Sequence, residues 1–204
     1  MLPCTEKSMP VSARPPSHAL LAATLCALAL TALPAGAQGT GGNSYGSPRA
    51  ASGMGAMVSR DDSKMMADLA QANIAEIESG KVALGKSSSE PVKKFAQQMV
   101  DDHTAALHEL QALAQSKGVK LPEGTDLAHK TLAMTLKAMT GTTFDSQYMK
   151  RSGVNDHQST AELLQNIQKN AKDTELKAMA AKMLPTVQQH LQMARQFVAV
   201  TDKK

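Results

Sequence analysis

Cysteine and aromatic residues are scarce in this sequence. Its 204 residues include two Cys, three Phe, two Tyr and no Trp. Both cysteines, Cys4 and Cys26, come before Ala37, after which we expect an exported chain to be cut, so the mature part would have no thiol. This excludes disulfide, zinc–thiolate and cysteine-nucleophile chemistry there. The core must then be built from Leu, Met, Ala, Val and Ile, a composition that suits closely packed helices.

The sequence also lacks concentrated charge and known catalytic motifs. Its formal net charge of +4 is spread along the chain, so we predict no nucleic-acid partner. There is no glycine-rich phosphate loop, no serine-centred elbow and no paired-histidine protease motif. We therefore predict that the protein is not an enzyme.

The first 37 residues have the features of a secretory signal peptide. Lys7 and Arg14 precede an apolar run over residues 19–33, and small residues lead up to Ala37. The run has about 15 residues, fewer than the roughly 20 that a transmembrane helix needs, so we expect an export signal rather than an anchor. Cleavage after Ala37 predicts a periplasmic or secreted protein with no transmembrane segment in its mature chain.

The remaining chain divides into a linker and one domain. Residues 38–60 are rich in Gly, Ser and Ala and are expected to form a flexible tether. Residues 61–201 have the length of a single domain and carry apolar residues at helical spacing, which predicts an all-α four-helix bundle. The long connection between the second and third helices carries a short extra helix. The expected helices cover residues 61–86, 90–117, 126–139, 144–171 and 174–200.

Polar residues interrupt the apolar stripes of all four long helices. His103, His157 and His190 lie on the second, third and fourth helices, and Glu76 lies on the stripe of the first. With a rise of about 1.5 Å per residue, all four lie near the middle of their helices and at similar depth. Imidazole and carboxylate groups on facing helices bind transition metals in helical bundles. We therefore predict a metal site formed by Glu76, His103, His157 and His190, with the identity of the ion left open.

Two other interpretations of these residues remain. In one, the buried histidines form a polar network of hydrogen bonds across the core without any metal. In the other, the three histidines form no shared cluster. Asp102 and Asp156 adjoin two of the histidines but point about 100° away on a helix. We expect them to lie at the surface or to support the ligands. The many methionines are simpler to explain as core filler than as copper(I) ligands.

At these residues the chain resembles a family of exported bacterial proteins known as the domain of unknown function 4142. The resemblance implies a ferritin-like fold and an envelope location, but it implies no activity. Di-iron ferritins have a Glu three residues before a ligand His, whereas this chain has Val100, Val154 and Val187 at those positions. The matching segments are NIAEIESGK (73–81), VKKFAQQMVDDH (92–103), FDSQYM (144–149), DHQ (156–158), LP (184–185) and HL (190–191).

From these features we predict an exported ferritin-like bundle of the cell envelope with a non-enzymatic binding or stress-related role. One alternative is a redox or storage protein with a Glu/His metal site in the bundle core. Another is a structural module that engages a further envelope component, which apolar surface at Leu127, Leu132 and Leu136 would favour.

Overall fold

The computed structural model describes residues 58–203 and is all-helical over that range. The predicted signal peptide and nearly all of the predicted tether lie outside the described residues. Within the described part, the all-α prediction is confirmed, and no helix there is both long and apolar enough to cross a bilayer. The elements are α1 (Arg60–Lys86), α2 (Glu90–Ser116), α3 (Leu127–Lys137), α4 (Gly141–Tyr148), the π-helix η1 (Met149–Asp156), α5 (His157–Asn170) and α6 (Thr174–Thr201).

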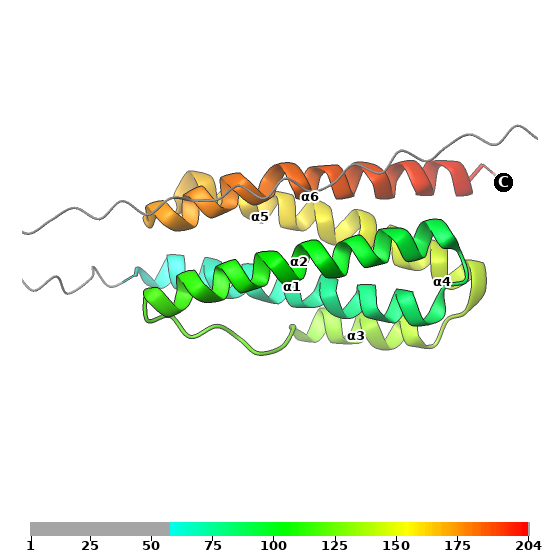
Figure 1. Ribbon diagram of the computed structural model, residues 1–204, viewed down its shortest axis with the longest axis horizontal. Helices are drawn as coiled ribbons and strands as arrows, with labels where there is room; N and C mark the ends of the chain where they lie inside the picture. Colours follow the sequence, from blue (N-terminus) through cyan, green and yellow to red (C-terminus); the bar gives the residue numbers. More distant parts are fainter. Residues whose placement is uncertain (1–57, 204) are drawn as a thin grey trace, which may run out of the picture. The chain divides into compact units, whose positions relative to one another are not determined.

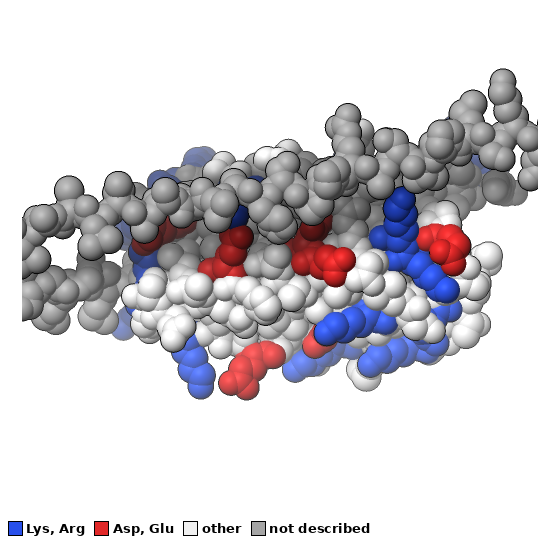
Figure 2. Space-filling model, in the orientation of Figure 1, with Lys and Arg blue, Asp and Glu red and all other residues white. Residues whose placement is uncertain are grey.

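The helices form two hairpins and a covering helix. α1 packs mainly against α2, and α6 packs mainly against α5 and η1, while α3 lies along α1 (Figure 1). The direct contact between α2 and α6 is less extensive. On the face shown in Figure 2, acidic and basic side chains both occur, with uncharged surface between them.

Local capping explains where the helices begin and end. The Ser59 hydroxyl accepts a hydrogen bond from the Asp62 amide at 3.1 Å at the start of α1. The Asp173 carboxylate accepts from the amides of Glu175 and Leu176 at the start of α6. Gly118 follows α2 with φ 67°, a conformation that glycine adopts at little cost. The expected helix ends at these positions are therefore confirmed to within about two residues.

The third long helix differs from its prediction. It was expected over residues 144–171 as a regular α-helix, but it begins at Gly141 and contains the eight-residue π-helix η1. Gly153 explains why η1 can lie so close to α6. A Cβ atom at Gly153 would lie 2.8 Å from the Ala194 Cβ, closer than real side chains approach.

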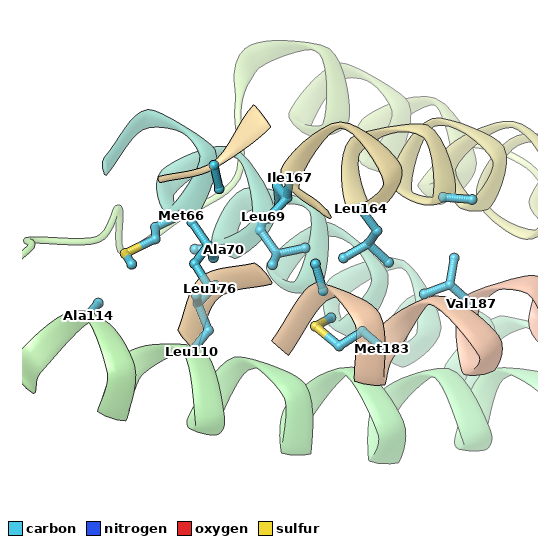
Figure 3. Close-up of a cluster of buried hydrophobic side chains, with 13 residues drawn as sticks. Met66, Leu69, Ala70, Leu110, Ala114, Leu164, Ile167, Leu176, Met183 and Val187 are labelled. Atoms are coloured by element: carbon cyan, nitrogen blue, oxygen red, sulfur yellow. The ribbon is translucent and has the colours of Figure 1, made fainter. Parts of the chain in front are cut away.

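Two apolar clusters fill the bundle, with a polar layer between them. One cluster is formed by residues such as Met66, Leu69 and Leu164 (Figure 3). The other contains residues such as Phe95 and Tyr148. Along every long helix, buried polar side chains occur in sequence between members of the two clusters, whereas the buried Asp62 and Asp145 lie outside this layer. The layer contains Asn73, Glu76, Ser79, His103, Ser152, His157, Thr160 and His190.

The short helix α3 buries part of its apolar face against the bundle. Leu136 is fully buried and belongs to the second cluster, and Leu132 packs against that cluster. Leu127 is 78% exposed and Met134 is 64% exposed. Of the three leucines named for an interaction surface, only Leu127 is therefore largely exposed, and Leu136 contributes to the fold itself.

Candidate metal centre

Three histidines from three different helices meet in the polar layer. His103 comes from α2, His157 from the start of α5 and His190 from α6, and their exposed fractions are 3%, 0% and 1%. Their ring centroids are 5.4 to 5.7 Å apart. One ring nitrogen from each lies within 4.8 Å of the other two. The structure thus brings together three of the four residues predicted to form the site.

The position of the proton on His103 follows from Asn73 on α1. The Asn73 Nδ2 donates to the Leu69 carbonyl oxygen at 2.7 Å, so its Oδ1 faces His103. The His103 Nδ1 lies 2.9 Å from that Oδ1. Because a carbonyl oxygen only accepts hydrogen bonds, the Nδ1 must carry the hydrogen. The Nε2 of neutral His103 is therefore left with a free lone pair.

His157 is oriented in the same way by the π-helix. Its Nδ1 lies 2.8 Å from the backbone oxygen of Ser152, five residues earlier. The Nδ1 therefore donates, and the Nε2 of neutral His157 has no hydrogen. The two Nε2 atoms of His103 and His157 lie 3.4 Å apart. With both lone pairs free, neither nitrogen can donate to the other, so no hydrogen bond joins them and both lone pairs are available to a cation.

His190 completes the group and is held by a carboxylate. Its Nε2 lies 2.9 Å from the Asp102 Oδ2, closer than the Gln98 Nε2 at 3.5 Å. The carboxylate therefore accepts the Nε2 hydrogen. The His190 Nδ1 is buried and has no hydrogen-bond partner among the described residues. Asp102, whose side chain is 42% exposed, thus supports His190 from the neighbouring helix.

Burial keeps all three imidazoles neutral near pH 7. Desolvation is the main cause that lowers the pKa of His103 well below its ordinary value, and the charges of His157 and His190 lower it further. Desolvation likewise lowers the pKa of His157 to about 4, although the hydrogen bond to Ser152 opposes this. It also lowers the pKa of His190, against the opposing effect of Asp102. Neutral imidazole is the form that binds metals.

Glu76 lies beside His157 but outside the group of three. Its Oε1 is 3.3 Å from the His157 Nδ1, the nitrogen that donates to Ser152 and faces away from His103. The Glu76 side chain is 2% exposed, and neither carboxyl oxygen has a hydrogen-bond partner among the described residues. Burial, followed by the charge of Asp156, raises the pKa of Glu76 well above its ordinary value. Its role as a fourth ligand stays a prediction.

Two orienting groups were not found from the sequence. Asn73 is a buried polar residue on the apolar stripe of α1, three residues before Glu76, and this position is a signal that sequence reasoning could have used. The Ser152 carbonyl had no such signal, because its bond to His157 depends on the π-helical turn. In metal sites, groups of this kind fix the tautomer and direction of the ligands.

Solved structures of other proteins have a fold similar to that of this chain. The structure resembles a "DUF305 fragment from Deinococcus radiodurans" with a TM-score of 0.63 and 12% identity, covering 70% of this chain and 97% of that one. It also resembles CopM in the Cu(II)-bound form, with a TM-score of 0.57, 20% identity and coverages of 68% and 95%. For CopM in the Cu(I)-bound form the TM-score is 0.55, with 16% identity and coverages of 67% and 94%.

No curated protein matches this sequence. The family model described as "Domain of unknown function (DUF4142)" matches residues 47–197. The chain therefore belongs to the DUF4142 family, as its sequence segments indicated.

Proposed function

We propose that this protein binds one transition-metal ion through His103, His157 and His190, with copper as its preferred metal, in a non-enzymatic role in the cell envelope. The observation that carries the proposal is the 3.4 Å contact between the two Nε2 atoms of His103 and His157. Each neutral ring donates its single N–H hydrogen, from Nδ1, to Asn73 or Ser152, so two lone pairs face each other in a buried space. A bound cation would remove that repulsion.

The spacing suits a metal ion. Two nitrogen ligands at roughly 2.0–2.1 Å from one tetrahedral ion lie about 3.3–3.4 Å apart. His103 and His157 are therefore already at the separation of two ligands, with the ion between them. His190 has a ligand nitrogen within 4.8 Å of both and would need a shift of about an ångström or more to complete the set.

The chemistry of the ligands favours copper or zinc over calcium or magnesium. Hard cations prefer oxygen ligands, whereas three neutral imidazoles suit Cu, Zn, Fe or Ni. Cu²⁺ binds most tightly in the divalent series, and the fold is similar to that of CopM, which is described in copper-bound forms. The signal-like first 37 residues support the envelope location. Together with the three-histidine group, this is the basis for proposing a binding role related to metal stress.

A polar core network without metal is the main rival. A direct hydrogen bond between the His103 and His157 rings would need one of them to take up a proton, although burial lowers the pKa of all three histidines. Otherwise one ring would have to turn, which would break its bond to Asn73 or Ser152. Both routes leave a buried polar group less well satisfied than a bound ion would.

Metal analysis of the mature protein tests the proposal. The protein is purified without chelator or affinity tag, its metal content is measured, and the metal-free form is titrated with Cu²⁺ and Zn²⁺. We expect about one ion per chain, with copper bound more tightly than zinc. A variant with His103, His157 and His190 changed to Ala should lose this binding while keeping its helical circular dichroism.

The matched control changes to Ala the two histidines that lie outside the group but after the predicted cleavage site, His108 and His129. It should bind metal like the wild type. Wild-type protein that binds no metal, or a triple variant that binds as well as the control, would show the proposal to be wrong.

A further inference from the structure

A pocket lies between α2 and α6 and reaches two of the three histidines. It has a volume of about 150 Å³, and both His103 and His190 line it. His157 does not line it and is completely buried. The pocket therefore gives access to one side of the three-histidine group, along the seam where α2 and α6 make less extensive contact.

The described residues close the opposite side of the group. Phe95 packs near the His157 ring, with ring centroids 6.2 Å apart. The Glu76 carboxyl lies at the Nδ1 edge of His157, away from His103. Three imidazoles leave a tetrahedral ion one ligand short. Sites whose protein ligands fill every position are structural, whereas sites with three protein ligands bind an external molecule at the fourth.

We propose that the bound ion keeps one coordination position open toward the α2/α6 pocket and binds a small exchangeable ligand there, either water or a compact anion. This inference rests on the proposed function. It adds a second binding step, in which the metal-loaded protein takes up a ligand of a few atoms from solution.

The size of the pocket limits that ligand. A volume of about 150 Å³ corresponds to roughly five water molecules at about 30 Å³ each. Water, hydroxide or a three-atom anion such as azide fits this space.

The walls of the pocket add little attraction of their own. In the lining, the Lys182 Nζ lies 2.7 and 2.8 Å from the two carboxylate oxygens of Glu109, so these charges are paired. The Asp102 carboxylate accepts from His190. Val187 and Met183 add apolar surface. An anion in the pocket is therefore held by the ion itself, whose charge three neutral imidazoles do not cancel.

Azide binding to the Cu²⁺-loaded protein tests the inference. Azide on Cu²⁺ produces a ligand-to-metal charge-transfer band, so a titration followed by absorbance gives its dissociation constant. Thr186 lines the pocket and is exposed, so Thr186→Phe should narrow the pocket without disturbing the core. The control is Gln189→Phe, at an exposed position of α6 outside the lining.

We expect wild type and Gln189→Phe to have the same dissociation constant for azide. For Thr186→Phe we expect a dissociation constant at least about tenfold higher, at unchanged copper content. Copper-loaded wild type whose spectrum azide leaves unchanged would overturn this inference and leave the proposed function intact. Equal azide binding by all three proteins would also overturn it. Wild type that takes up no copper or other metal would overturn both proposals.

Discussion

The Oδ1 of Asn73 lies 2.9 Å from the Nδ1 of His103 and determines which nitrogen of that ring faces the other two histidines. The amide is itself oriented by its bond to the Leu69 carbonyl within α1. A residue on the one long helix that supplies no histidine to the group therefore controls the direction of a lone pair on α2. The chemistry of the site depends on these supporting bonds as much as on the three imidazoles.

Replacing Asn73 should weaken metal binding without removing a ligand. In Asn73→Leu the His103 Nδ1 loses its acceptor, so the ring can turn or change tautomer, and we expect metal affinity to fall about 10- to 100-fold. Asn73→Asp keeps an acceptor at the same place and should retain most of the affinity. Competition titration against a chromophoric chelator measures both. Equal losses in the two variants would contradict the orienting role.

The contribution of the buried histidines to the stability of the metal-free protein should fall as the pH drops below about 6.5. In the unfolded chain the histidines take up protons near their ordinary pKa, whereas burial lowers the pKa of His157 in the fold to about 4. The unfolded state thus binds more protons across this window, and stability is lost progressively from about pH 6.5 down to about pH 4. For His157 alone the full effect is on the order of 3 kcal/mol.

Urea unfolding at a series of pH values, with chelator present, measures this dependence. His157→Gln removes one titrating group and should flatten the curve between pH 6.5 and pH 4. The variant is compared with His108→Gln, which changes an exposed histidine. The same pH dependence in wild type and His157→Gln would show that His157 is not held neutral by burial.

The helices could be predicted from local signals, but the fine geometry of the site could not. Ser59, Asp173 and Gly118 mark helix ends through bonds and dihedral angles that involve only near neighbours in sequence. The common depth of the three histidines follows from the helical rise and the helix ends. The π-helix η1 has no such local signal, and at Gly153 it packs closely against Ala194, a contact between distant segments.

The position of Glu76 relative to His157 likewise could be predicted only in part. Its position on the apolar stripe of α1 correctly indicated burial next to the histidines. Which edge of His157 it would face depends on the rotation of that ring. The Ser152 carbonyl of η1 sets this rotation, and no pattern in the sequence specifies it.

Changing Glu76 to Gln should distinguish a buried, protonated carboxyl from a fourth metal ligand. If the carboxyl is buried and protonated, the neutral amide replaces it at little cost. Because burial raises the pKa of Glu76, its stability contribution is lost as the pH rises above the ordinary value of 4.5. Glu76→Gln should therefore be at least as stable as wild type at pH 7, with the difference growing at higher pH.

The same variant should bind metal with an affinity within about threefold of wild type, because the geometry places Glu76 at the Nδ1 edge of His157. Urea unfolding between pH 5 and pH 8 and chelator competition provide the two measurements. A loss of metal affinity of about 100-fold or more would instead support Glu76 as the fourth ligand.

Adding one methyl group at Gly153 should disturb both the fold and the site. A Cβ there would meet the Ala194 Cβ at 2.8 Å, so η1 and α6 must move apart, and we expect Gly153→Ala to destabilise the protein by about 1–3 kcal/mol. Gly85→Ala is the matched control, because nothing lies within 4 Å of its Cβ in helix α1. It should stabilise the protein by roughly 0.5–1 kcal/mol.

Since His157 and His190 flank this contact along the chain, Gly153→Ala should also weaken metal binding, which Gly85→Ala should not. Denaturant unfolding and chelator competition on both variants measure these effects, and equal behaviour of the two alanines would show that close packing of η1 on α6 does not position the histidines.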